Sequence, residues 1–362
     1  MHFSEQGLDM TKKLITLLTV VALSGCIPSG LTTLILEKGL DARMSANALA
    51  ELEDGLHLAL CGAGGPMPAP NASGPCVLVI AGERMFVVDS GADGVRNIAR
   101  MGYPIGQIEA VFLTHFHSDH LDGLGEMGTL RWATGANQSP LTVYGPEGVE
   151  KVVEGFNMAY SHDVVYRHAH HGDAVAPTSG AGLLAKPFAK PPEGALAVLL
   201  EDSNLKIEAL AVNHSPVDPA VGYRFTYKGR SLLVTGDTVK SKNIENFAKG
   251  IDLLVHEALA PNLVTMMNET AKKAGNTVME HVTHDILDYH ASPVEAAETA
   301  RDAGVGHLVY YHIVPPLVIP GQKALYLNGA DKIFKNYTVG EDGVAFSLPA
   351  GSNEIVQTSK GL

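Results

Sequence analysis

The stretch HFHSDH occupies residues 115–120 and follows directly on the apolar segment AVFLT at residues 110–114. An apolar strand that ends in polar side chains is the usual way for an α/β protein to present functional groups. Imidazole and carboxylate are ligands that Zn²⁺ accepts. This cluster therefore predicts a metal site, in which His115 and His117 face one metal ion while Asp119 and His120 face a second.

The second half of the chain supplies more ligand types in similar places. His214, Asp237 and His312 each come just after a segment that we predict to be a strand. Taken singly, each could be a turn residue, a helix cap or a hydrogen-bonded core residue. Taken together, they complete a ligand set for two metal ions, with Asp237 as the carboxylate that bridges them.

Outward from these residues, short apolar strands alternate with helical segments, which is typical of an α/β fold. We predict strands at residues 57–61, 76–80, 85–89, 110–114, 141–144, 197–200, 205–212, 221–227, 231–235, 253–256 and 307–311. We predict helices at residues 95–101, from about 121, and at 147–158, 261–274 and 293–303. Residues 161–194 show no period and are rich in proline, glycine and histidine, so we predict a long loop or insertion there.

The composition is that of a globular protein that can bury a sizeable core. The chain has 362 residues, of which 46% are hydrophobic and 18% are charged. The formal net charge of −13 opposes binding to a nucleic-acid backbone, and lysine and arginine are scattered along the sequence. We therefore expect that nucleic acid is not the partner.

The N-terminus has the pattern of an export signal. Two lysines precede an apolar stretch at residues 14–23, which is too short to span a bilayer comfortably. The stretch closes with LSGC at residues 23–26, which resembles a bacterial lipobox whose cysteine is lipidated. We expect an exported lipoprotein, anchored through a lipid on Cys26 and facing the periplasm; ordinary secretion into the periplasm and an uncleaved anchor are the alternatives.

Two cysteines remain beyond this signal, Cys61 and Cys76. In an oxidising compartment they could pair and close a loop of roughly 15 residues, which stabilises a fold by ~3 kcal/mol in the chain-entropy model. The other interpretation is two buried thiols in neighbouring strands. The sequence leaves both open.

Together, these motifs resemble the metallo-β-lactamase superfamily. The HFHSDH run, a later histidine, the tripeptide GDT at residues 236–238 and the final His312 occur in the family's order, over roughly residues 56–348. The resemblance implies a four-layer αββα sandwich, with two mixed sheets between outer helices. The domains are then a signal at residues 1–26, a tether and short helix at 27–55, and a hydrolase domain at 56–350.

Within the superfamily, the chain looks most like the branch that contains ribonuclease Z and the zinc-dependent arylsulfatases. The residues that carry this likeness are LCGAGGP at 60–66, HEA at 256–258 and HASP at 290–293. The resemblance implies two Zn²⁺ ions, with Mn²⁺ or Fe as alternatives because no thiolate ligand selects for zinc. One ion would be held by His115, His117 and His214, the other by Asp119, His120 and His312, with Asp237 bridging.

The same resemblance suggests the catalytic roles. Two metal ions lower the pKa of a bridging water, so that hydroxide is available near neutral pH. Asp119 would orient this hydroxide or take its proton. His290, at the start of a helix, is our candidate for protonating the leaving group, with a capping or core role as the alternative. Glu257 would orient His290, or instead bind the local backbone.

Several other features are weaker. The histidines at 162, 168, 170 and 171, beside Arg167, could line the substrate entrance or hold an anion, but a solvated histidine run explains them as well. His281 and His284 could line the pocket of His290. Asp89 more simply supports the loops beneath the metal ions. The glycines at 62–65 lack the following Lys-Ser or Lys-Thr of a phosphate-binding loop, so we do not expect a nucleotide there.

For the substrate, we predict a small molecule, a sulfate or phosphate ester, as in the arylsulfatase-like members. An exported, acidic chain does not meet tRNA precursors, and the short interval between His214 and Asp237 leaves no room for a tRNA-gripping arm. The alternatives are a ribonuclease Z-like endonuclease, a β-lactam or lactone hydrolase, and a non-catalytic lipoprotein that sequesters zinc. Edge strands and outer helices would allow a homodimer.

Overall fold

The structure is a computed structural model that describes residues 29–45 and 47–360, in two compact units. The described part of the first unit is the helix α2 (Ser29–Ser45). The predicted signal and Cys26 lie outside the described residues. We predicted a tether and a short helix at residues 27–55; α2 ends at Ser45, and Leu49 is instead buried in the core of the second unit. In the described part of the chain, no helix has the length and apolarity needed to cross a membrane.

The second unit (Ala48–Leu362) contains two mixed β-sheets. The first sheet has the order β15-β14-β1-β2-β3-β4-β5-β6, antiparallel from β15 to β3 and parallel from β3 to β6. Its strands are β1 (Gly55–Gly62), β2 (Cys76–Ala81), β3 (Arg84–Val88), β4 (Ile108–Phe112), β5 (Leu141–Pro146), β6 (Leu183–Phe188), β14 (Val344–Pro349) and β15 (Val356–Ser359).

The second sheet has the order β13-β12-β11-β10-β9-β8-β7. Strands β10 to β13 are parallel, and β7 to β10 are antiparallel. The strands are β7 (Leu196–Glu201), β8 (Leu205–Ala211), β9 (Val221–Tyr227), β10 (Arg230–Val234), β11 (Leu253–Leu259), β12 (His307–Val314) and β13 (Tyr337–Val339). The carboxyl ends of the parallel strands of each sheet lie at one edge, where side chains from several strands can meet.

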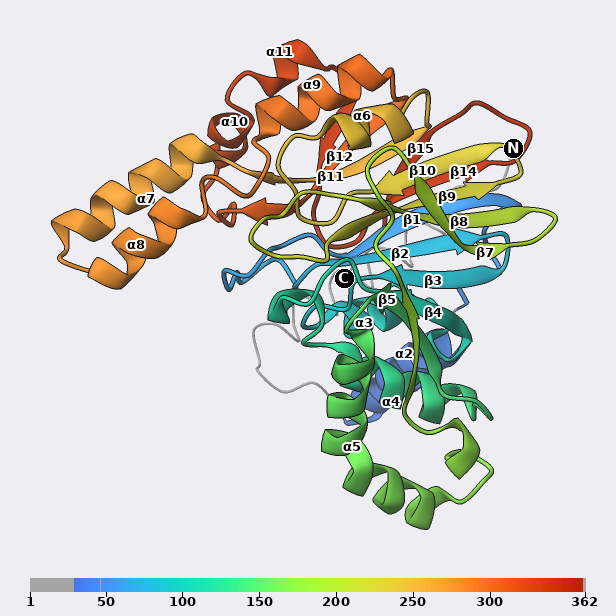
Figure 1. Cartoon of the computed structure of the whole chain (residues 1–362). Coiled ribbons are helices and arrows are strands. Elements are labelled where there is room, and N and C mark those ends of the chain that lie inside the picture. The colour runs from blue at the N-terminus through green and yellow to red at the C-terminus, as the bar shows by residue number, and fades with distance from the viewer. Residues whose placement is uncertain (1–28, 46, 361–362) are drawn as a thin grey trace, which may run out of the picture. The chain divides into compact units, whose positions relative to one another are not determined.

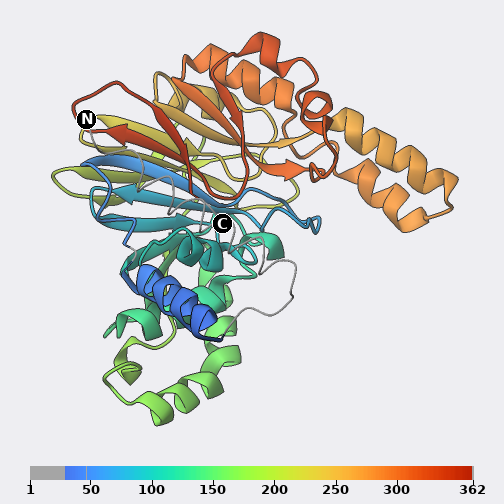
Figure 2. The ribbon, with the colours of Figure 1, turned by 180° about the vertical axis from the view of Figure 1, so that it is seen from behind.

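Helices cover the outer face of each sheet, as Figures 1 and 2 show for this unit. The first sheet is covered by α3 (Gly94–Arg100), α4 (Leu124–Gly135) and the start of α5 (Val149–His171); the second by α6 (Lys242–Phe247), α9 (Pro293–Ala303), α10 (Gln322–Leu327) and α11 (Ala330–Ile333). The helices α7 (Pro261–Lys273) and α8 (Thr277–Asp285) form a hairpin that projects to one side. The predicted α/β class and four-layer αββα sandwich are confirmed.

Aromatic side chains fill the space between the two sheets and fix the strand that leads into the HFHSDH run. The ring of Phe112, at the end of β4, lies edge-on to Phe225 and Tyr223 of the facing sheet, with ring centroids 5.8 and 5.3 Å apart. The buried hydroxyl of Tyr223 donates a hydrogen bond of 2.5 Å to the carbonyl of Leu113. The backbone just before His115 is therefore held by the opposite sheet.

The tract at residues 161–194, which we predicted to be a long loop, has a different structure. Helix α5 continues to His171, and a short 3-10 turn (Thr178–Gly180) and strand β6 follow it. Only Val149 and Val153 of α5 are buried, so the second half of this helix has no apolar face. Sequence patterns detect helices through their buried face, and this part of α5 therefore shows no period.

The structure contains a disulfide between Cys61 at the end of β1 and Cys76 at the start of β2, and both cysteines are fully buried. Of the two interpretations of these cysteines, the structure therefore has the disulfide and not two separate thiols. The bond spans 15 residues of chain and closes the loop that carries the glycine-rich segment.

We expect replacement of both cysteines by alanine to lower the free energy of unfolding by about 3 kcal/mol, the chain-entropy value for a loop of this length. Urea unfolding with and without a reductant measures this, because the reductant should weaken the wild type and leave the double variant unchanged. Free thiols at both Cys61 and Cys76 in the denatured, unreduced wild type would contradict the disulfide.

Candidate metal centre

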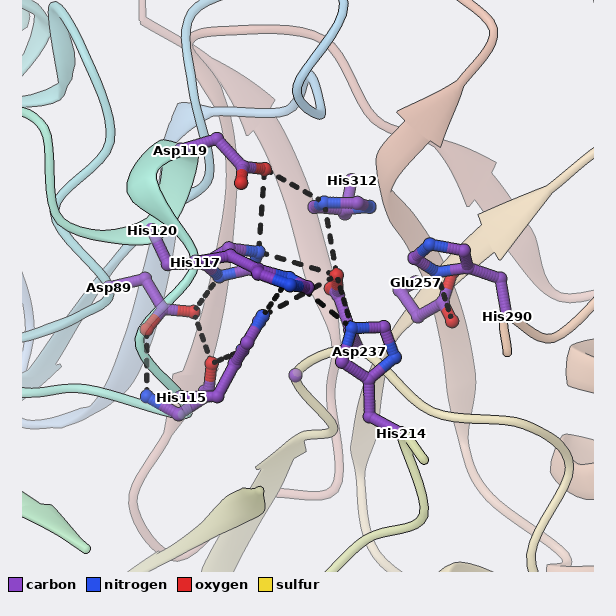
Figure 3. A network of polar contacts seen from close by, with 12 residues as sticks. Asp89, His115, His117, Asp119, His120, His214, Asp237, Glu257, His290 and His312 are labelled. Carbon is purple, nitrogen blue, oxygen red and sulfur yellow. Dashed lines mark hydrogen bonds and ion pairs between the residues drawn. The ribbon is translucent and has the colours of Figure 1, made fainter. Parts of the chain in front are cut away.

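The seven predicted ligands meet at one edge of the sandwich, where strands from both sheets end (Figure 3). They form two groups, in each of which the ligand atoms lie within 4.8 Å of one another. The first group is His115, His117, His214 and Asp237, and the second is Asp119, His120 and His312. The structure therefore brings together side chains that are up to 197 residues apart in sequence, counted from His115 to His312.

A buried carboxylate, that of Asp89, accepts hydrogen bonds from the HFHSDH run and from the residue before it. Asp89 lies just after β3 and accepts hydrogen bonds from the Thr114 backbone N–H (2.8 Å), the Thr114 hydroxyl (2.9 Å) and His120 Nδ1 (2.8 Å). Since the Thr114 proton points to Asp89, its oxygen accepts from His115 Nδ1 at 3.1 Å. Both imidazoles thus carry a proton on Nδ1 and turn Nε2, the atom that would bind metal, toward the cluster, as metal-binding histidines do.

His214 is oriented in the same way by a main-chain group. Its Nδ1 donates to the carbonyl of Tyr289 at 2.9 Å, which directs the Nε2 lone pair inward. Sequence reasoning missed this contact, because every residue carries a carbonyl and nothing in the sequence marks the one that is used.

The inner atoms of the cluster are suited to a cation. The His115 Nε2 atom lies 2.9 Å from His117 Nδ1, and His214 Nε2 lies 3.4 Å from the same atom. Among the described residues, the buried atoms His120 Nε2 and Asp237 Oδ1 have no hydrogen-bond partner. Lone pairs that face one another in a buried site are costly unless a proton or a metal ion lies between them. The donor set therefore fits a metal centre.

The electrostatics of the cluster agree with this fit. Burial lowers the pKa of three imidazoles, those of His115, His117 and His214, and the neutral form is the one that binds metal. Burial opposes ionisation of Asp237, but His312 and His120 hold its pKa well below the ordinary value. At His120, the charges of Asp237 and Asp89 outweigh burial and raise the pKa, so metal binding there would release a proton.

A β-bulge turns His312 toward the cluster. In the pairing of β11 with β12, Glu257 pairs with Tyr311 and Ala258 pairs with Ile313, so His312 is the extra residue. Its φ of 45° lies in the left-handed region, which is strained for a residue with a side chain. His312 Nε2 consequently lies 3.3 Å from Asp119 Oδ2 and 3.4 Å from Asp237 Oδ2.

A histidine outside the seven ligands borders the cluster. His290 Nδ1 lies 3.1 Å from Glu257 Oε1, and the same oxygen accepts the backbone N–H groups of Ala291 (3.1 Å) and Thr238 (3.0 Å). Glu257 is fully buried and so connects the segment after Asp237 to the segment of His290. His290 also lies close enough to Asp237 and His312 to form a third possible ligand group with them. Its role therefore needs a test that measures metal content.

Comparisons with known proteins agree with this arrangement. A family model described as a beta-lactamase superfamily domain matches residues 84–313. The chain belongs to the metallo-β-lactamase superfamily.

Similar proteins place it more closely within this superfamily. A ribonuclease Z from Mycobacterium bovis (strain BCG / Pasteur 1173P2) is 36% identical over 270 residues, which are 74% of this chain and 89% of that protein. Two solved structures share the fold. Human tRNase Z, short form, has a TM-score of 0.58 at 19% identity, covering 81% of this chain and 99% of that one. The metallo-β-lactamase fold protein YhfI from Bacillus subtilis has a TM-score of 0.56 at 18% identity, covering 82% and 100%.

The predicted membership of the ribonuclease Z branch and the prediction of a metal-dependent hydrolase acting on ester bonds are confirmed, which leaves the non-catalytic alternative without support. Two other predictions are wrong. The relatives named ribonuclease Z contradict both the small-molecule ester substrate and the expectation that nucleic acid is not the partner. The net charge of a chain is a sum over its whole surface, so it does not describe the charge at the metal site. An export signal concerns the location of a protein, so it does not identify the substrate of its site.

The remaining histidines of the sequence analysis do not join the cluster. His168, His170 and His171 lie at the end of α5, which extends away from the sheets (Figure 1), and His168 binds the carbonyl of Ala176. His281 and His284 are exposed on α8, and His281 pairs with Asp285. Among the described residues, none of these histidines belongs to a group that could hold a metal ion.

The glycine-rich loop has a packing role that its sequence did not reveal. A Cβ added to Gly65 would lie 3.1 Å from His312 Cε1 and 3.0 Å from Val314 Cγ2. Contacts this short require the neighbour to move by a few tenths of an ångström. The absence of a side chain at Gly65 therefore allows His312 to keep its position.

We expect Gly65→Ala to displace the His312 imidazole and to weaken metal binding by roughly 10- to 100-fold, as changes around metal ligands do. Metal titration of the purified protein measures this. Gly155→Ala is the matched control, because nothing lies within 4 Å of its added Cβ on helix α5. Equal metal affinity in the two variants would show that Gly65 does not position His312.

Proposed function

We propose that this chain is a metal-dependent endoribonuclease of the ribonuclease Z type, which hydrolyses phosphodiester bonds in RNA. The observation that carries the proposal is the two-group cluster of inward-facing ligands with His290 beside it, in a chain 36% identical to a protein named ribonuclease Z. The structural neighbour named tRNase Z adds a likeness of fold.

We further propose that the resident metal is zinc, with two ions. Imidazole, the main ligand type of the cluster, suits zinc, and the division into two groups supports two ions with Asp237 between them. When bound, two such ions supply a nucleophile at neutral pH and neutralise the charge that develops on the phosphate.

The protein side chains then supply positioning and proton transfer. Asp119 remains ionised, since His312 and His120 lower its pKa against the effect of burial, and it is half-buried at the mouth of the cluster, where it can accept a proton from the attacking water. His290 donates a proton to the leaving oxygen, and Glu257 holds its imidazole in place.

The test is cleavage of a tRNA precursor transcript and of an unstructured oligoribonucleotide by the purified protein, with added Zn²⁺ and with a chelator. We expect cleavage with zinc, none after chelation, and recovery when zinc is returned. A deoxyribonucleotide of the same sequence is the control for RNA chemistry. A protein that carries two metal ions and cleaves neither RNA would contradict the proposal.

We also propose that the chain is exported and anchored through Cys26. The disulfide between Cys61 and Cys76 supports this, because such bonds persist in oxidising compartments. Cys26→Ser should move the protein from the membrane fraction to the soluble fraction of a bacterial host. An unchanged distribution would contradict the anchor without bearing on the reaction.

A further inference from the structure

Tyr289 presents an aromatic ring at the edge of the metal cluster. It lies between α8 and α9, and its ring centroid is 5.4 Å from that of His214 and 4.9 Å from that of His290. The side chain is only partly buried, so part of the ring faces solvent. An aromatic surface is thus available directly beside the reacting groups.

A polar cavity borders the same ligand. This cavity of about 480 Å³ is lined by the segment around His214 and by the connection from β6 to β7. Among the described residues that line it, Lys190 is the one lysine or arginine, and it pairs with Asp218. Two carboxylates, those of Glu193 and Asp218, also line the cavity. The cavity therefore places a lysine in the same lining as the ligand His214, in a chain of net negative charge.

We propose that Tyr289 and Lys190 form a binding surface for single-stranded RNA next to the scissile bond. The ring of Tyr289 stacks on an unpaired base, and Lys190 leaves Asp218 to contact a neighbouring phosphate. This inference rests on the proposed ribonuclease function and specifies how the site holds its substrate.

The chemistry of single strands supports this pairing of residues. Proteins bind such strands by stacking unpaired bases on aromatic side chains and by lining the backbone with positive charge. Both elements border His214, so a strand that passes over the cluster would meet both. A duplex offers no free base face, which makes an unpaired segment the preferred ligand.

The first test compares an oligoribonucleotide with the same strand carrying abasic sites around the cleavage position. Tyr289→Leu should raise KM for the intact strand by roughly 5- to 150-fold, the loss of one base stack, and leave the abasic strand little affected. Tyr289→Phe keeps the ring and should preserve the difference between the two strands. Equal losses on both strands at full metal content would overturn the stacking role.

The second test concerns charge. Lys190→Ala should weaken binding of the intact strand and reduce the slope of log Kd against log salt by about 0.7, the value for one phosphate contact. Asp218→Asn should have the opposite effect and strengthen binding. Lys228→Ala is the matched control, because Lys228 pairs with Asp54 at similar exposure in the turn before β10, at the other end of that strand from Asp237. Equal salt slopes for the Lys190 and Lys228 variants would overturn the phosphate contact.

The two tests distinguish failure of this inference from failure of the proposed ribonuclease function. If the wild type binds zinc but cleaves neither strand, the ribonuclease assignment is wrong and this inference falls with it. If the wild type cleaves RNA and the Tyr289 and Lys190 variants match it on the intact strand, only this inference is overturned.

Discussion

Replacing Asp237 with alanine is expected to remove most of the bound metal and, with it, the hydrolytic activity. Its Oδ2 atom lies 3.4 Å from His120 Nε2 and 3.4 Å from His312 Nε2, so it joins both ligand groups. It also approaches His115 Nε2 at 3.9 Å and His214 Nε2 at 3.8 Å. No other ligand of the described cluster belongs to both the four-residue group and a group with His312.

The expected loss is larger than for residues that only support a ligand. Replacing such outer partners costs about 10- to 100-fold in metal affinity, and Asp237→Ala should exceed that range. Asp237 supplies negative charge as well as ligand atoms, so its removal would leave five imidazoles and a single carboxylate, that of Asp119, to hold the metal. Metal content per chain and the rate of RNA cleavage measure the effect.

The matched control is Asp122→Ala. Asp122 lies two residues from His120, and its side chain is exposed rather than directed into the cluster. This variant should retain metal and activity. An Asp237→Ala protein that binds two metal ions as tightly as the Asp122 control would contradict the bridging role.

Most of the sandwich could be predicted because its strands are buried on both faces. β2, for example, is buried along its whole length and appears in the sequence as a continuous apolar run, as does the first half of β11, LLV at residues 253–255. Three of the strands that sequence reasoning missed, β6, β13 and β15, lack this signal, whereas β14 is largely buried but its apolar residues are interrupted by Ser347. Every residue of β15 is exposed, and β6 has one buried residue, Leu183. Their place in the first sheet depends on pairing with β14 and β5, which no local pattern records.

The ligands could be found from sequence for a related reason. Each lies after a buried strand or, for His312, near the end of one, and the strand ends of the two sheets meet in space. The groups that hold these ligands in place cannot be recognised from the sequence in this way. The carbonyl of Tyr289 orients His214, and the missing side chain of Gly65 leaves space for His312. Neither contact follows from residue type, so both appear only in three dimensions.

Replacing His290 with alanine is the second change with a large expected effect, on the rate rather than on metal binding. Burial works against a charge on His290, but Glu257, through its charge and hydrogen bond, raises the pKa of His290 to about 9, with a further contribution from Asp237. The imidazole is therefore protonated at neutral pH and can act as an acid toward the leaving oxygen. Loss of a general acid costs about 10²- to 10⁴-fold in kcat.

Two measurements separate this role from a ligand role. His290→Ala should keep the metal content of the wild type, as should the control His281→Ala, whose exposed imidazole lies on α8. If the His290 variant loses a metal ion while the control does not, His290 is a ligand and the acid role is wrong.

Glu257→Gln tests the same assignment through pH. Activity that needs protonated His290 should fall as the pH rises through about 9, the raised pKa of His290. Glutamine keeps an oxygen that can accept the backbone N–H groups of Ala291 and Thr238, but it removes the negative charge. The pKa of His290 should then drop, and the falling limb of the kcat profile should move to lower pH. A lower kcat with an unmoved limb would show that Glu257 only braces the loops, because a purely structural defect does not shift the pH at which the acid loses its proton.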